Sequence, residues 1–491
     1  MGQDGSRSAP VDARVLQERV DRKWEEEIVP ALKAFIEVPA KSPAFDAQWE
    51  AHGFLDRVVS DAVAWCEGQQ VQGLKMEVLR LKKPDGSSRT PVIFFEVPAF
   101  QSQAKETVLM YGHLDKQPEF SGWSNGLEPW VPKIVDDRLY GRGGADDGYA
   151  IYTSVAIVKM LQELKASHPR IVGVVETCEE SGSVDLPPYL DVLRERMGDV
   201  GMVVCLDSGA GNYDQLWMTN SLRGMAAGEL RVDVLTQGVH SGDASGVVPS
   251  SMRIMRQLLD RLEDSRTGGL LPKVFEAQIP SKRLQEAQEA AAVLGANLVE
   301  RFPWATGANG KRVEAVEGDL VQALLGRTWR PTLSVTGVDG MPSLDSAGNV
   351  LRPYTTFKLS FRLPPTADAQ AVQKEVKALL EKDPPYNAKV TYKPNAPGRG
   401  WNLPDYSPWL AQALQSASQA FYGAPCAFVG QGGSIPLINL LQESFPKAQM
   451  LVCGVLGPNS NAHGPNEFLH LPYARKLTAS VAMVMASFQD H

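Results

Sequence analysis

The chain has 491 residues, of which 43% are hydrophobic and 22% are charged. This composition excludes a disordered or fibrous protein, and the length predicts roughly two to four domains. The formal net charge of −8 excludes the basic surface that a nucleic-acid-binding protein or a protein of anionic membranes needs, so we expect neither partner.

The cysteines and the hydrophobic segments narrow the class further. Five cysteines without paired CxxC spacing exclude a disulfide scaffold and a zinc ribbon. Cys178 and Cys205 lie in apolar runs and are expected to be buried thiols. The start of the chain lacks the apolar core of a signal peptide, and no run of 18 or more apolar residues occurs. A cytoplasmic protein is therefore expected.

In chain order, the pattern first predicts helices over 12–37 and 46–68 and then a hairpin around a Pro-Asp-Gly turn. Four short apolar runs follow, each ending in polar residues: 107–115, 170–180, 200–209 and 448–457. Helical segments lie between several of them, at about 147–165, 186–197, 407–422 and 434–443. Alternation of helices with continuously apolar strands predicts an α/β fold with a mainly parallel sheet covered by helices on both faces.

In the middle of the chain, this alternation of helices and continuously apolar strands stops. From Leu222 onward the strands alternate polar and apolar residues, which is typical of sheets with one exposed face. Helices are expected at 249–264, 281–301 and 367–382. We therefore expect an α+β domain over 220–394, inserted into a first domain formed by 1–219 and 395–491.

Histidines and carboxylates follow the apolar strands. The carboxyl ends of parallel strands meet at one edge of a sheet, where ligands bind. The side chains expected there are His113, Asp115, Asp146, Asp147, Glu179, Glu180, Asp207 and His463. Taken singly, each fits an ordinary turn, helix cap or solvated loop. Together they would repel one another unless cations bind, and a mixed His/carboxylate set suits Zn²⁺, Mn²⁺ or Co²⁺.

The motifs that carry these residues resemble those of the metallopeptidase 20 family. They are HLD at 113–115, GRGGADDG at 141–148, EESGS at 179–183, LDSG at 206–209, HSG at 240–242 and AHGPNE at 462–467. Their order and spacing are most similar to the carnosinase and cytosolic non-specific dipeptidase branch, and the resemblance runs from about residue 20 to 485. It implies a zinc-exopeptidase-like catalytic domain with an inserted lid and dimerisation domain.

The resemblance also implies a site with two divalent metal ions, Zn²⁺ or Mn²⁺. His113 and Asp207 would hold one metal, Glu180 and His463 the other, and Asp146 would bridge them. Glu179 would be the general base for a metal-bridged water that attacks the scissile amide. Asp115 would orient the imidazole of His113.

The resemblance implies four further site residues, three of them in the inserted domain and one, Ser434, after it. His240 would stabilise the oxyanion of the tetrahedral intermediate in the active site of a partner subunit, which implies a homodimer. Arg362 would bind the free carboxylate of a small peptide substrate, since a guanidinium can do so with two hydrogen bonds. Ser434 would also contact that carboxylate, and Asn349 would supply a further polar contact from the lid.

Two positions depart from the family pattern, and one backbone feature is expected from it. Gly148 stands where the family often has lysine, and Asn349 differs from the threonine pattern of the animal dipeptidases. The peptide bond between Asp146 and Asp147 is expected to be cis.

The function that these features predict is the metal-dependent hydrolysis of dipeptides. The alternative is an N-acyl or N-carbamoyl amino acid amidohydrolase or a carboxypeptidase of the same family, because one metal centre serves all these reactions. A non-catalytic homologue would have lost Glu179 or a metal ligand. GRGGADDG is not a GxGxxG motif, and this argues against a dinucleotide enzyme.

Overall fold

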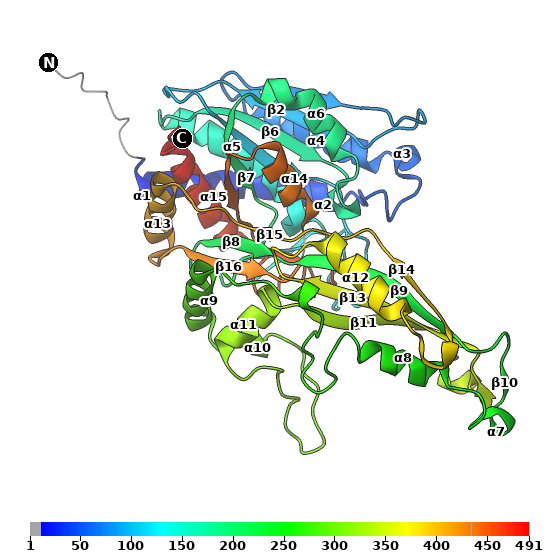
Figure 1. Cartoon of the computed structure of the whole chain (residues 1–491). Coiled ribbons are helices and arrows are strands. Elements are labelled where there is room, and N and C mark those ends of the chain that lie inside the picture. Colours follow the sequence, from blue (N-terminus) through cyan, green and yellow to red (C-terminus); the bar gives the residue numbers. More distant parts are fainter. Residues whose placement is uncertain (1–10, 434, 491) are drawn as a thin grey trace. The chain divides into compact units, whose positions relative to one another are not determined.

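The computed structural model describes residues 11–433 and 435–490. Two compact units are present (Figure 1). The first comprises residues up to 219, residues 403–429 and the residues from 440 onward, and the second comprises 220–402 and 430–439. The second unit thus takes in 395–402 and 430–439 in addition to the insertion expected from the sequence.

The first unit is built on a six-stranded sheet with the strand order β1-β2-β6-β3-β7-β17. β6, β3, β7 and β17 run parallel, whereas β1 and β2 form an antiparallel edge. The strands are β1 Lys75–Leu79, β2 Val92–Val97, β3 Thr107–His113, β6 Arg170–Glu176, β7 Val200–Cys205 and β17 Gln449–Val452. β3 and β7 are buried along their whole length, which confirms the mainly parallel, covered sheet.

Helices cover this sheet; among their contacts, α4 packs on β1 and β2 and α5 packs on β3. Three further helices, α1, α13 and α15, pack against one another. The helices of the first unit are α1 Ala13–Lys23, α2 Val29–Ile36, α3 Trp49–His52, α4 Phe54–Gly68, α5 Tyr149–Glu163, α6 Leu186–Met197, α13 Pro408–Tyr422 and α15 Leu471–Ala486. α14, Pro436–Ser444, crosses from the second unit into the first.

Two of the helices expected from the sequence are interrupted. The segment expected over 12–37 is helical, but it contains a π-helical stretch, η1, at Trp24–Ile28 between α1 and α2. The helix expected over 281–301 ends at Leu294, because Gly295 has a φ of 55° and terminates it. A short helix, α10, then spans Asn297–Glu300.

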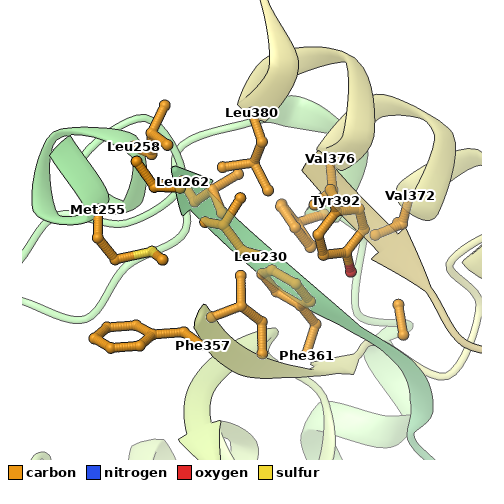
Figure 2. Packing of buried hydrophobic residues seen from close by; sticks show 14 of the residues in the cluster. Leu230, Met255, Leu258, Leu262, Phe357, Phe361, Val372, Val376, Leu380 and Tyr392 are labelled. Atoms are coloured by element: carbon orange, nitrogen blue, oxygen red, sulfur yellow. The ribbon is translucent and has the colours of Figure 1, made fainter. Parts of the chain in front are cut away.

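The second unit contains a four-stranded antiparallel sheet with the order β11-β13-β9-β14. Its strands are β9 Gly224–Asp233, β11 Thr332–Asp339, β13 Tyr354–Leu363 and β14 Lys389–Pro394. The helices α8, Ser251–Leu259, and α12, Ala369–Glu381, contact this sheet. Figure 2 shows the core between them, where Leu230, Phe357 and Phe361 of the strands meet side chains of the two helices.

Residues along β13 alternate in burial. Phe357, Leu359 and Phe361 are buried in the core of the second unit, whereas the residues between them are half-buried or exposed. Because successive side chains of a strand point to opposite faces, Arg362 lies on the face of the sheet away from α8 and α12. Its guanidinium is therefore available to a site on that face.

Shorter elements complete both units. The small sheets have the orders β10-β12, β15-β8-β16 and β18-β5-β4. Their strands are β4 Lys133–Val135, β5 Arg138–Tyr140, β8 Trp217–Leu222, β10 Val239–His240, β12 Val350–Leu351, β15 Trp401–Asn402, β16 Ala427–Gln431 and β18 Phe468–His470. The remaining helices are α7 Ser241–Ala244, α9 Ser281–Leu294 and α11 Leu320–Thr328. Within the described ranges, no helix is both long and apolar enough to span a membrane.

Candidate metal centre

The expected ligands come from five segments of the first unit. His113 is the last residue of β3, and Asp207 follows β7 by two residues. Glu180 lies in a short 3-10 turn after β6, and Asp146 lies in a turn that precedes α5. His463 lies in the loop between β17 and β18. The parallel strands thus deliver three of the five residues at their carboxyl ends, as argued from the sequence.

These side chains form two groups that share one carboxylate. In the first group, His113 Nε2 lies 3.4 Å from Asp146 Oδ1 and 3.8 Å from Asp207 Oδ2. In the second, His463 Nε2 lies 3.0 Å from Asp146 Oδ2 and 3.3 Å from Glu180 Oε2. In each group the candidate ligand atoms lie within 4.8 Å of one another.

The electrostatics of this cluster are those of a site that lacks positive charge. Burial raises the pKa of Asp207 to about 6, with Asp146 adding to the effect and His113 opposing it. Burial and the neighbouring Asp146 also raise the pKa of Glu180 well above its usual range. Burial would lower the pKa of His113, but the carboxylates of Asp115, Asp146 and Asp207 outweigh it and raise that pKa. Bound cations would relieve this crowding of carboxylates.

The donor set also fits divalent cations. His113 Nε2 and Glu180 Oε1 are buried, and no described residue forms a hydrogen bond with either atom. Bonds of about 2.1 Å at tetrahedral angles place two ligands of one Zn²⁺ about 3.4 Å apart, and the spacings within both groups are close to this value. The His463 side chain is exposed, so the centre is open on that side.

Glu179 belongs to neither group of ligands. Its Oε2 lies 3.9 Å from His113 Nε2, so the carboxylate borders the first group. Removal from water raises its pKa well above the usual range, and the charges of Asp207 and Asp115 act in the same direction. The adjacent residues Glu179 and Glu180 therefore differ in position, since only Glu180 joins a ligand group.

Asp115 contacts both His113 and the two glutamates. Its backbone carbonyl lies 3.0 Å from His113 Nδ1, while its carboxylate Oδ1 is 3.5 Å away from the same atom. The carboxylate accepts hydrogen bonds from the backbone N–H groups of Glu179, at 3.1 Å, and Glu180, at 3.0 Å. Asp115 therefore ties the turn that bears the glutamates to the end of β3.

Sequence reasoning missed a buried ion pair that joins three loops of the centre. Glu467, in the AHGPNE motif, accepts from Arg142 Nη1 at 2.6 Å and from the backbone N–H of Gly143 at 3.0 Å. Arg142 also donates to the carbonyls of Pro118, at 3.1 Å, and Gly464, at 2.7 Å. Both residues lie inside the GRGGADDG and AHGPNE motifs, and that is the signal from which a role could have been suspected.

A second buried cation, Lys116, was also missed. Its ammonium group donates to the carbonyls of Phe35, at 2.7 Å, and Val38, at 2.8 Å, and lies 3.9 Å from the centre of the Phe35 ring. A side chain on Gly143 would collide with the Lys116 stem at 2.8 Å. Lys116 therefore packs beneath the turn that carries Asp146.

The packing around Gly148 leaves no room for a side chain. A Cβ there would lie 2.2 Å from the Phe35 ring, so no larger side chain fits unless Phe35 moves. The Asp146–Asp147 peptide bond is cis, and Asp147 lies buried with Oδ2 3.3 Å from the backbone nitrogen of His113.

The remaining candidates belong to the second unit. His240 ends β10 and pairs with Val350 of β12, and the backbone carbonyl of Asn349 accepts from Ser241 N at 2.9 Å, so His240 and Asn349 are close neighbours. Arg362 lies near the end of β13, opposite Thr332 of β11 and Met225 of β9. Ser434 lies outside the described residues.

The Arg142–Glu467 pair yields a prediction about stability. Replacing Glu467 with Gln should lower the free energy of unfolding by about 3–5 kcal/mol, because it leaves the buried Arg142 guanidinium without its counter-charge. The matched control is Glu77→Gln, since Glu77 pairs with Arg196 at the same 2.6 Å on the exposed surface. The control should change stability by no more than about 1 kcal/mol. Urea unfolding of both variants measures the difference, and equal losses would contradict the role of the buried pair.

Comparison with known proteins places this arrangement in a family. The chain is 27% identical to human "Beta-Ala-His dipeptidase" over 443 residues, which cover 87% of this chain and 83% of that protein. It is also 27% identical to "Cysteinylglycine-S-conjugate dipeptidase" of Corynebacterium striatum, with 74% of this chain and 76% of that protein covered.

A solved structure shares the fold. The crystal structure of human carnosine dipeptidase 1 superposes with a TM-score of 0.75 at 22% identity, covering 98% of this chain and 100% of that one. The family model described as "Peptidase family M20/M25/M40" matches residues 109–487, which include all five candidate metal ligands. The chain belongs to the peptidase family M20/M25/M40.

Proposed function

We propose that the protein is a dipeptidase that hydrolyses short peptides with a free carboxyl terminus and depends on two divalent metal ions. The observation that carries this proposal is the pair of ligand groups that share Asp146, with the carboxylate of Glu179 beside them. The relatives named as dipeptidases over most of the chain support the same substrate class.

In this proposal the ligand groups have separate tasks. His113 and Asp207 would hold one cation, Glu180 and His463 the other, and Asp146 would hold both. Two bound cations would polarise the scissile carbonyl group and acidify the attacking water. Imidazole and carboxylate ligands suit Zn²⁺ and Mn²⁺, which are the metals we propose.

Glu179 would act as the general base and then as the general acid. Its carboxylate is outside the ligand groups but lies beside His113, and a carboxylate in that position could accept a proton from the attacking water and pass it to the leaving amine. Asp115 would be a positioning residue, because its carbonyl lies at His113 Nδ1 and its carboxylate binds the turn with the two glutamates.

The second unit would bind the substrate and form the dimer. Arg362 would bind the terminal carboxylate of the peptide together with Ser434, and Asn349 would add a polar contact. His240 would stabilise the developing oxyanion in the partner subunit of a homodimer. The lid and dimerisation domain would correspond to residues 220–394. We further propose a cytoplasmic location, which the five free, buried cysteines favour.

The test of this function is a comparison of Ala-Leu with its N-acetyl and C-terminal amide forms. The enzyme is stripped with chelator and reloaded with Mn²⁺ or Zn²⁺. We expect metal-dependent hydrolysis of the free dipeptide alone, because a blocked carboxyl terminus removes the partner of Arg362 and a blocked amine changes the substrate class. Hydrolysis of the N-acetyl form alone would assign the protein to the amidohydrolases or carboxypeptidases, and no hydrolysis of any form would refute the proposal.

Glu179→Gln should lower kcat by roughly 10²–10⁴-fold, because the amide cannot accept the proton of the attacking water. The metal content measured by atomic emission should stay at the wild-type value, since Glu179 is in neither ligand group. Asp207→Asn is the comparison variant, in which both activity and metal content should fall. Near-normal kcat in Glu179→Gln would exclude the general-base role.

The action of His240 across a dimer can be tested by mixing two inactive variants. Glu179→Gln and His240→Ala are each expected to be inactive as homodimers, and they are mixed after reversible dissociation. If His240 acts in the partner's site, each mixed dimer regains one complete site, and an equimolar mixture recovers roughly a quarter of the wild-type activity. Activity that stays at the level of the separate variants would place His240 in its own subunit's site or in none.

A further inference from the structure

Three arginines of the second unit form no ion pair with any residue that the structure describes. Arg223 directly precedes β9, Arg327 lies in the last turn of α11, and Arg362 lies near the end of β13. A side chain on Gly432 would meet Arg223 Nη2 at 3.3 Å and Arg327 Cγ at 3.4 Å, so these two arginines flank the same backbone segment. That segment leads into Gly433 and Ser434.

Arg223 is fixed by neutral groups only. It is 8% exposed and donates to the carbonyls of Gly432, at 3.1 Å, Gly326, at 3.3 Å, and Arg330, at 3.4 Å. It also donates to Thr332 Oγ1 at 3.4 Å. These contacts hold the guanidinium in place, but they do not neutralise its charge.

The side chain of Arg327 is less completely hydrogen-bonded than that of Arg223. The Nε of Arg327 is buried and finds no hydrogen-bond partner among residues 11–433 and 435–490. Burial lowers the pKa of Arg327 to about 10, with the charges of Arg301 and Arg223 acting in the same direction. Burial lowers the pKa of Arg223 to about 10 as well, and Arg362 contributes to that shift. Contacts also connect the three residues. Arg362 pairs across the strands with Thr332, whose hydroxyl accepts from Arg223, and Arg223 in turn flanks Gly432 together with Arg327.

Three other arginines of this unit do have acidic partners. Arg231 pairs with Asp233 at 2.7 Å, Arg330 lies 3.5 Å from Glu317, and Arg283 pairs with Glu286. Among the described residues, none of Arg223, Arg327 and Arg362 forms an ion pair. Buried charges are usually paired in folded proteins, and Arg223 is buried while Arg327 and Arg362 are half-buried, so the three charges would be stabilised by an anion.

We propose that Arg223, Arg327 and Arg362 form a binding site for a dicarboxylate, the C-terminal residue of a dipeptide whose side chain is also acidic. One carboxylate is satisfied by one bidentate guanidinium, and three guanidiniums exceed what a single terminal carboxylate requires. The inference rests on the proposed dipeptidase function and adds to it a preference for Glu or Asp as the C-terminal residue.

The test compares Ala-Glu with Ala-Gln, which have nearly the same shape and differ in the charge of one group. The metal-loaded wild-type enzyme should hydrolyse Ala-Glu with a kcat/KM at least ~10-fold higher, the factor that corresponds to about 1.4 kcal/mol. In Arg327→Gln this ratio should fall to near one, and Arg327→Lys should restore part of it because the charge is retained. Arg231→Gln is the control and should leave the ratio at its wild-type value, since Arg231 has its own acidic partner.

The outcomes separate this inference from the proposed function. Hydrolysis of both dipeptides with a ratio near one in the wild type would refute the dicarboxylate site and leave the dipeptidase intact. If neither dipeptide is hydrolysed, calorimetric titration of the metal-loaded protein with glutarate and with butyrate decides the matter. Tighter binding of glutarate that is lost in Arg327→Gln would support the site, and equal binding of the two acids, or no change in the variant, would overturn it.

Discussion

The carboxylate of Asp146 lies between two imidazoles, and the geometry of the whole centre depends on it. Its two oxygens face different groups, with His113 and Asp207 on one side and His463 and Glu180 on the other. Burial would raise its pKa, but the hydrogen bonds and charges of His113 and His463 outweigh burial and hold that pKa below its usual range. A carboxylate that belongs to both ligand groups could hold both of the proposed cations.

The position of Asp146 requires rigid surroundings, and buried charged side chains provide them. Arg142 and Glu467 join the loop with His463 to the turn with Asp146, while Lys116 fills the space beneath that turn. Asp115 ties the glutamate turn to the end of β3. Each of these groups would cost several kcal/mol if left unpaired, so each fixes the position of the loops that it joins.

The two units concentrate side chains of opposite charge. The first unit gathers carboxylates that need cations, whereas the second gathers guanidiniums that need an anion. Each unit by itself thus presents a charge that is complementary to a group of the proposed dipeptide substrate.

The sequence by itself determined the sheet of the first unit and much of the metal centre. Continuously apolar runs predicted the buried parallel strands, and residues at their ends were expected to meet at one edge of the sheet. The pattern alone therefore grouped His113, the Glu179–Glu180 pair and Asp207, whereas the choice between the two glutamates came from the family resemblance. The tertiary structure alone decided the partners of these residues. Arg142 and Glu467 are 325 residues apart, and Arg223, Arg327 and Arg362 come from three separate elements. Strand periodicity is local and can be read from neighbours in the chain, whereas a buried charge takes its partner from whatever segment packing brings beside it.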